Sequence, residues 1–234
     1  MTSKNFRFYM HYRADPLETI EERHRQFTEG MLQLPPPLGW KNVSIPPAPD
    51  CGDELGASFW VKYPNHGLQL EGRYVYRGST YKYRDQVFYD DKVWISFNAA
   101  GGKIDYKEML REHLVRAMIA FQGYAGHGYM ASHSRHYSEL RAAEISKLRL
   151  DPSIDVNGRN NIFTLNVAEY WDAELCQRAL GYGRDEVIKR LSGKVPLVRP
   201  LMDGVYVVFS DNPDLTFEEF CAYNDRLKPV LGLA

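Results

Sequence analysis

The order of periodic segments predicts an α+β protein, in which an antiparallel or mixed β-sheet is covered by helices within a single domain. Strand-like alternation is concentrated between residues 57 and 97, where the intervening turns are too short for crossover helices. Helical periodicity dominates residues 105–191, and two short strand-like runs and a last helix follow. The length of 234 residues favours one domain, with the polar segment 152–161 as a candidate hinge.

The N-terminal residues predict a strand and then a helix. Residues 5–13 alternate between apolar and polar side chains, and one face holds Phe6, Phe8, Met10 and Tyr12. Asp15 is the expected cap of the following helix, because Pro16 suits the first helical position and Glu18 completes a capping-box pattern. We expect this helix to extend past Met31 and to stop before the prolines at 35–37.

A long proline-rich loop, residues 35–56, separates this helix from the first of the later strands. Loops of this length in compact domains are often functional, and prolines reduce the entropy lost when a loop is ordered by a partner. The loop carries one large aromatic residue, Trp40, and a cluster of acidic residues formed by Asp50, Asp53 and Glu54. We therefore expect it to contribute to a binding surface.

The remaining elements follow from changes of period. Expected strands are 57–63, 68–77, 81–89 and 92–97. A helix is expected from Asp105 to Phe121, and the glycine-rich run 123–128 is expected to end it. Later helices are expected near 137–150, 166–180 and 185–191, and short strands at 195–199 and 205–209. Thr216 and Glu219 form a capping box that predicts a last helix through Leu227.

Composition excludes several classes of protein. The chain has 29 Lys+Arg against 30 Asp+Glu, a formal net charge of −1, so it is neither a globally basic nucleic-acid binder nor a globally acidic DNA mimic. No apolar stretch is long enough to span a bilayer, and the N-terminus lacks the apolar region of a signal peptide. We therefore expect a cytoplasmic protein with no membrane partner.

The residues that could carry chemistry do not form a recognisable catalytic or metal motif. Cysteines are few and widely spaced, without a C-x-x-C pair, and are expected to be reduced thiols: Cys51, Cys176 and Cys221. Three histidines within ten residues could meet a metal, but no acidic residue lies among them to assist, so solvated side chains are favoured: His127, His133 and His136. We expect no catalytic activity, no cofactor and no metal.

Charge is distributed unevenly along the chain. Residues 71–149 contain 13 basic and 9 acidic residues, and the Arg- and Tyr-rich strands at 71–89 could bind nucleic acid through Arg73, Arg77 and Arg84. Strand alternation alone also accounts for that pattern. Residues 201–234 contain six acidic and two basic residues, which indicates either ordinary helix capping or a surface for a basic partner.

The C-terminal third resembles immunity protein family 52. The similarity is carried by Glu169-Tyr-Trp171-Asp-Ala-Glu-Leu-Cys176, by Pro200 to Tyr206, and by Asp214 to Gly232 with its Asn224-Asp-Arg-Leu-Lys-Pro229 run. It is clearest over residues 160–234, and the chain length and the order of elements also fit. Members of that family are encoded beside toxins of polymorphic and type VI secretion systems, notably toxins with a restriction-endonuclease-like nuclease domain.

This resemblance implies a non-catalytic antitoxin that neutralises a cognate nuclease effector by stoichiometric protein–protein binding. No direct contact with nucleic acid is implied. Because nucleases present basic clefts, acidic residues beside aromatic anchors are the expected contacts: Trp40, Asp50, Asp53, Glu54, Asp211, Asp214 and Glu218. The other tryptophans, Trp60, Trp94 and Trp171, are expected in the core. Nucleic-acid binding by residues 71–89 is the alternative.

Overall fold

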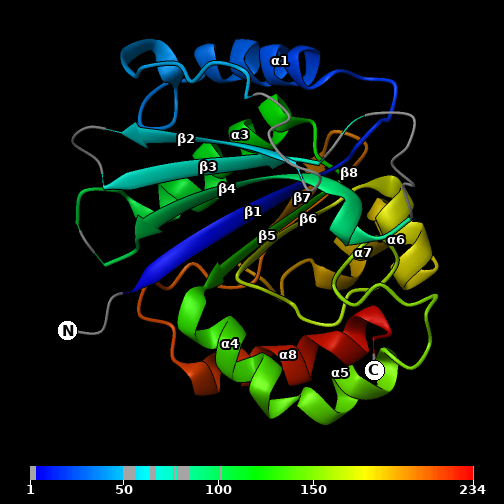
Figure 1. Ribbon diagram of the computed structural model, residues 1–234. Coiled ribbons are helices and arrows are strands. Elements are labelled where there is room, and N and C mark those ends of the chain that lie inside the picture. Colours follow the sequence, from blue (N-terminus) through cyan, green and yellow to red (C-terminus); the bar gives the residue numbers. More distant parts are fainter. Residues whose placement is uncertain are drawn as a thin grey trace.

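One antiparallel sheet organises the protein, as the computed structural model in Figure 1 shows. The structure describes residues 4–49, 56–63, 67–75, 77, 85–100 and 102–233. In this part of the chain, eight strands pair in the order β2-β3-β4-β1-β5-β6-β8-β7. They are β1 (Asn5–Arg13), β2 (Ala57–Tyr63), β3 (Leu68–Tyr74), β4 (Asp90–Asn98), β5 (Ala125–Met130), β6 (Ala168–Trp171), β7 (Leu197–Leu201) and β8 (Gly204–Val208).

Every neighbouring pair of strands is antiparallel, so the predicted α+β class is confirmed and the mixed-sheet alternative is not needed. Strands from both sides of the segment 152–161 belong to the same sheet. The helices are α1 (Ile20–Leu32), α2 (Tyr106–Glu108), α3 (Leu114–Phe121), α4 (Ala131–Leu140), α5 (Ala142–Leu148), α6 (Ala173–Leu180), α7 (Arg184–Leu191) and α8 (Phe217–Leu231). A π-helical turn, Met109–His113, joins α2 to α3, and 3₁₀ turns lie at Trp40–Asn42 and Val87–Tyr89.

Helices α1 and α3 cover one face of the sheet; in Figure 1, α3 lies behind the strands and α1 lies above β2. The alternation in β1 predicts this burial, because Phe6, Phe8 and Met10 all point toward that side and are fully buried. The two helices pack closely: a Cβ atom on Gly30 of α1 would lie 2.9 Å from the Cβ of Ala120 of α3. Gly30 thus permits close helix packing and does not break the helix.

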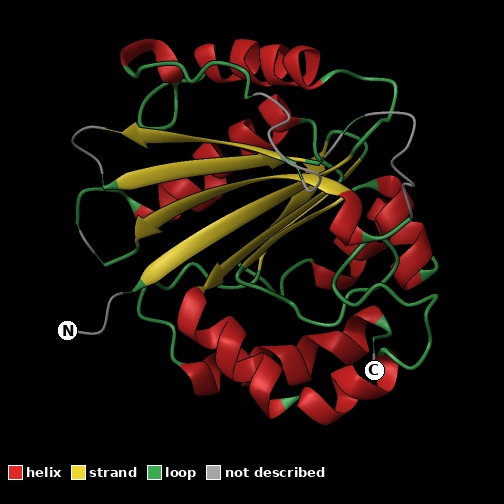
Figure 2. Cartoon of the chain, viewed as in Figure 1, coloured by secondary structure: helices red, strands yellow, loops and turns green. Residues whose placement is uncertain are grey.

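Only part of the opposite face is covered. Helix α8 packs over the half made by β6 and β8, where Trp171 contacts Phe209 and Phe209 stacks on Tyr223 of α8. The other half, made by β2, β3, β4, β1 and β5, is in plain view in Figure 2 with no described helix lying across it. Within the described part of the chain, one face of the sheet is therefore covered along most of its strands, and helices cover the other face only in part.

The preceding helix ends at Phe121, just before the glycine-rich run 123–128, as predicted, but most of this run belongs to the central strand β5 and not to a loop. Glycine is required there because phenylalanine rings of β1 occupy the space beside it. A Cβ on Gly126 would lie 2.7 Å from Phe8, and one on Gly128 would lie 2.8 Å from Phe6. The sequence alone does not distinguish a glycine-rich strand of this kind from a glycine-rich loop that ends a helix.

Two other boundaries differ from the predictions. Helix α1 is capped by Thr19, whose hydroxyl accepts a hydrogen bond from the amide of Glu22, and not by Asp15, which instead accepts one from the amide of Leu17. The expected helix 166–180 is strand β6 followed by α6, capped by Asp172. The first strand, the strand 57–63 and the capping box of α8 are confirmed. Among the described residues, no helix has the length and apolarity needed to cross a membrane.

Candidate partner-binding face

The uncovered half-sheet is the candidate functional site, and we call it the open face. It consists of the outward side chains of five strands: Ser58, Trp60 and Lys62 of β2; Gln69, Glu71 and Arg73 of β3; Lys92, Trp94 and Ser96 of β4; Arg7, Tyr9 and His11 of β1; and His127 and Tyr129 of β5. These positions share one face because side chains alternate along each strand. A rigid sheet presents them with little entropy to lose on binding.

An aromatic ladder crosses the middle of the open face. Tyr9 stacks on Trp94 at a ring-centroid distance of 5.4 Å and on Tyr129 at 5.8 Å, with interplanar angles of 13° and 9°. The three rings stand nearly parallel, side by side, and each is half-buried by its neighbours. Tyr9 is the central ring, with Trp94 on one of its faces and Tyr129 on the other.

The charges on the open face are mainly positive. Among the described outward side chains of these strands, Arg7, Lys62, Arg73 and Lys92 are basic, whereas half-buried Glu71 and buried Asp90, which pairs with Arg159, are acidic. Arg73 and Lys92 are directly opposite each other in the pairing of β3 with β4. Like charges in this arrangement destabilise a sheet. Burial lowers the pKa of Lys92, and Arg73 lowers it further, against the opposing influence of Asp90.

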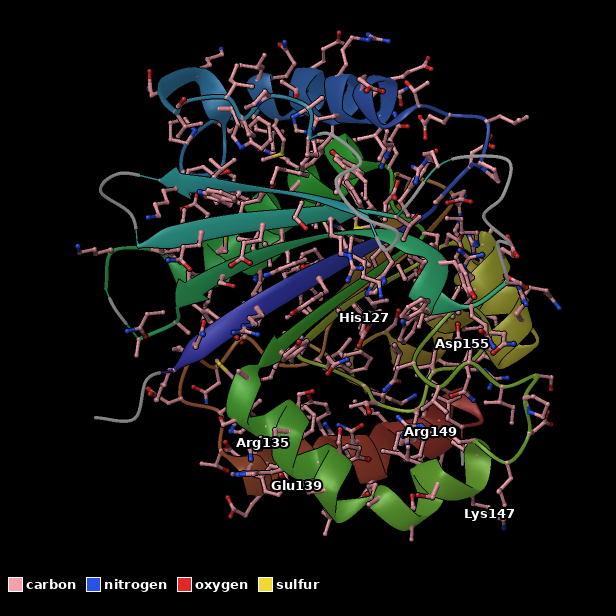
Figure 3. All side chains as sticks on the ribbon, viewed as in Figure 1. His127, Arg135, Glu139, Lys147, Arg149 and Asp155 are labelled. Atoms are coloured by element: carbon pink, nitrogen blue, oxygen red, sulfur yellow. The ribbon has the colours of Figure 1, made fainter. Side chains whose placement is uncertain are left out.

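A buried ion pair forms the inner border of the open face. His127 Nδ1 lies 2.6 Å from Glu169 Oε2, and Figure 3 shows His127 in the middle of the sheet. Glu169 also accepts hydrogen bonds from the amide and side chain of Asn166 and from the Trp171 indole. Burial lowers the pKa of His127, but Glu169 more than offsets this and the net shift is upward. This carboxylate links the open half of the sheet to the covered half.

A second histidine, His11, lies beside His127 with a ring-centroid distance of 5.4 Å. It is only 7% exposed, and burial lowers its pKa to about 4. Its Nδ1 is 3.4 Å from Asp90 Oδ2, too long for a strong hydrogen bond. Asp90 is instead bound by the Tyr124 hydroxyl at 2.6 Å and by Arg159 Nε at 2.8 Å. The two neighbouring imidazoles therefore differ in charge over much of the acidic range.

The outer edge of the open face carries an exposed tryptophan and a pocket. Trp60 is 68% exposed, so its predicted place in the core is wrong. It lies on β2, the edge strand of the sheet, and lines a pocket of about 440 Å³ between that strand and the loop containing Ile45, Pro46 and Pro47. Exposed tryptophan beside an apolar pocket is typical of a binding anchor. Trp94 is half-buried in the ladder, and Trp171 is fully buried as predicted.

Trp40, the predicted anchor of the proline-rich loop, is in the core. It is 1% exposed, packs on Phe27 and donates a hydrogen bond of 2.7 Å from its indole to the Tyr63 hydroxyl. The loop folds back against α1, which hides a residue whose proline-rich surroundings suggested exposure. The acidic residues predicted beside it, Asp50, Asp53 and Glu54, lie outside the described residues, as does Cys51.

The predicted C-terminal acidic contacts are partly neutralised within the protein. Asp211 lies 2.9 Å from Arg111 and also pairs with Lys107, and Asp214 pairs with Lys4. Glu218 is exposed in the first turn of α8, where the helix dipole favours it. These three residues lie in and just before the first turn of α8, whereas Trp40 is buried in the core.

The alternative nucleic-acid site at 71–89 is also divided. Arg77 is held by Asp91 at 2.6 Å, and Tyr74 is buried, so only Arg73 of the described candidates belongs to the open face. Tyr76 and residues 78–84, which include Arg84, lie outside the described residues. The histidines weighed as metal ligands are not brought together: His127 contacts Glu169, while His133 and His136 lie on α4 beside Phe217. Within the described ranges, no group of three or more His, Cys, Asp or Glu side chains is arranged to hold a metal ion.

Comparison with known proteins adds no assignment: no model of a known protein family matches the chain, and no curated protein matches it. The open face was missed by sequence reasoning even though a signal was present. In residues 5–13 the positions opposite the apolar face are Arg7, Tyr9, His11 and Arg13, and in 57–63 Trp60 alternates in step with Ser58 and Lys62. Large aromatic residues at the strand positions that otherwise hold polar side chains indicate an exposed aromatic surface.

Proposed function

We propose that this protein is a non-catalytic immunity protein that neutralises a secreted nuclease toxin by stoichiometric binding. The open face is the observation that carries the proposal. It is a rigid, uncovered half-sheet with Trp60, Tyr9, Tyr129 and Arg7, and these residue types supply most of the binding energy at protein interfaces. The resemblance of residues 160–234 to immunity protein family 52 supports the same function.

Neutralisation would occur in the cytoplasm, where the nuclease would meet its nucleic acid. A surface that is ordered before the partner arrives loses little entropy on binding, and a sheet provides one, because its side chains are fixed by strand pairing and by stacking across strands. The partner is the cognate restriction-endonuclease-like effector, recognised as a folded protein.

Co-expression with the toxin tests this function. The toxin encoded by the neighbouring gene would be induced in bacterial cells with and without this protein, and an active-site variant of the toxin would serve as the harmless control. We expect growth to be restored only when the protein is present, and a complex of fixed stoichiometry to be purified with the inactive toxin. Continued cell death despite folded, abundant protein would contradict the proposal.

A further inference from the structure

Two imidazoles meet where strands β1 and β5 pair, in the middle of the sheet. In the register of this pairing, His11 and His127 are diagonal neighbours, two positions apart along the strands. Aromatic side chains at diagonal positions are within reach of each other, and here the ring centroids are 5.4 Å apart with an interplanar angle of 64°. The two side chains are 9% and 13% exposed, so both imidazoles reach the surface of the sheet.

Each imidazole turns its Nδ1 atom toward a buried carboxylate. His127 Nδ1 lies 2.6 Å from Glu169 Oε2, and His11 Nδ1 lies 3.4 Å from Asp90 Oδ2. Neither Nε2 atom makes a hydrogen bond or an ion pair with a described residue. Histidines that bind metals show this arrangement, because a carboxylate at one ring nitrogen fixes the ring and raises the basicity of the other nitrogen. Both Nε2 atoms are therefore available to a ligand.

The buried charge of Glu169 requires a cation at this place. Its side chain is 1% exposed, and three neutral groups donate hydrogen bonds to it: the amide and the side chain of Asn166 and the indole of Trp171. Among the described residues, its only possible cationic partner is His127. Buried charges in proteins are paired or coordinate metals. Either a proton or a metal ion held by the Nε2 of His127 supplies the positive charge.

The position of His11 favours a metal ion over a proton. A proton on His127 needs no second imidazole beside it. The Asp90 carboxylate does not need that imidazole either, because the Tyr124 hydroxyl and Arg159 already bind it. Two imidazoles that bind one tetrahedral zinc ion, with Zn–N distances of about 2.1 Å, place their ring centroids about 5 Å apart. The observed separation of 5.4 Å fits this geometry.

We infer that His11 and His127 bind a divalent transition-metal ion of the zinc type through their Nε2 atoms. Imidazole nitrogen suits zinc, whereas magnesium and calcium prefer oxygen ligands. No third His, Cys, Asp or Glu among the described residues completes the set, so the other positions of a tetrahedral ion hold water. Lys92, which lies opposite His11, is attracted by Asp90 and Asp155, so its charge is partly balanced. This site goes beyond the proposed function and does not depend on it.

Metal titration of the protein alone tests the inference. The full-length chain, without a polyhistidine tag, is stripped of metal with EDTA, exchanged into chelator-free buffer at pH 7 and titrated with zinc chloride by calorimetry. We expect one ion per chain, and a Kd that rises at least about 30-fold in His11→Gln and in His127→Gln. An excess of magnesium chloride should not compete. The matched control is His133→Gln, which removes one imidazole from α4 and should leave the Kd within about twofold of wild type.

Two further measurements examine the carboxylate and the ring nitrogens. Glu169→Gln keeps the shape of the side chain but removes the charge behind His127, so the Kd for zinc should rise about 10–100-fold. In ¹H–¹⁵N spectra of the wild-type imidazoles, the Nε2 signals of His11 and His127 should shift when zinc is added, and Nδ1 of His127 should stay protonated. Circular dichroism shows which variants are folded, and the wild-type spectra keep the test decisive if a variant does not fold.

Three results would overturn the inference. The first is wild-type protein that binds no zinc in a fixed ratio. The second is an unchanged Kd in folded His11→Gln and His127→Gln. The third is loss of binding in His133→Gln, which would place the ion on α4. Because the toxin is absent from these experiments, none of these results bears on neutralisation, and a failure of neutralisation leaves the metal site unaffected.

Discussion

The two halves of one sheet face show how the same strand pattern serves two purposes. In the covered half, outward positions hold Trp171, Val205 and Val207, all fully buried beneath the layer that contains α8. In the open half, outward positions in register with them hold aromatic and basic side chains. Glu169 and His127 meet at the border between the halves. Under the proposed function, the open half is the part of this face that the toxin covers.

The largest effect expected is a contrast between two tryptophans on this face. Trp171→Ala in the covered half should lower the free energy of unfolding by about 3–5 kcal/mol, because it leaves a cavity and removes a hydrogen bond to Glu169. Trp60→Ala in the open half should change it by less than about 1 kcal/mol. Urea unfolding at pH 7 measures both values. Similar losses at the two positions would mean that the open half also serves as core.

An intermediate effect is expected from pH, acting through the border between the halves. The pKa of His11 is about 4 in the folded protein, below its ordinary 6.5, so the unfolded chain binds more protons between these values. Stability should therefore fall as the pH drops from about 6.5 to about 4, by at most about 3 kcal/mol from this residue. The raised pKa of His127 has the opposite effect on the pH dependence of stability. Its stabilising contribution is fully present below pH 6.5 and is lost as the pH rises through the raised pKa.

Unfolding of wild type and His11→Gln across pH 4–7 provides the measurement. The variant should show a shallower loss of stability on acidification, even if it is less stable at pH 7. Three other histidines also have lowered pKa values: His24, His113 and His133. Because they act in the same direction, the free energy of unfolding of the variant should still fall on acidification. If the free energy of unfolding depended on pH equally in the two proteins, the lowered pKa of His11 would be contradicted.

The smallest effect expected is a gain in stability. Lys92→Gln removes one of two cations that face each other across β3 and β4, and should raise the free energy of unfolding by about 0.2–1 kcal/mol. The same variant should bind the toxin more weakly, so stability and binding should change in opposite directions. The matched control, Lys62→Gln at an exposed position on β2, should be neutral for stability. A loss of stability in Lys92→Gln would mean that the cation is satisfied in the free protein.

Sequence reasoning succeeded where the signal is local and periodic. The alternation in residues 5–13 and 57–63 predicts β1 and β2 to the residue, and Thr216 with Glu219 predicts the start of α8. It failed where a distant element decides the outcome. Gly126 and Gly128 form a strand because rings from β1 fill the space of their missing side chains, and no local pattern reveals this.

The candidate site shows the same limit. The predictions for Trp40 and Trp60 are both wrong, because Trp40 is buried and Trp60 is exposed. The prolines around Trp40 suggest an exposed loop, whereas the alternation around Trp60 places it on the polar side of its strand. The aromatic ladder requires the pairing of β1 with both β4 and β5, and strand order cannot be read from periodicity. Charge counts along the chain located a basic middle region, but only the register shows which cations share one face.

The central position of β1 has a consequence for the synthesis of the protein. Its hydrogen-bonding neighbours are β4 and β5, which end at residues 98 and 130. At ribosomal rates of about 5–20 residues per second, roughly 6–23 s pass between the synthesis of β1, which carries Phe6, Phe8 and Met10, and the completion of both of its sheet partners. Strand β1 is thus made well before either of the strands that pair with it. Yield in cells should therefore depend on holding chaperones and rise at low expression temperature, more than for a protein whose first strand pairs with its second.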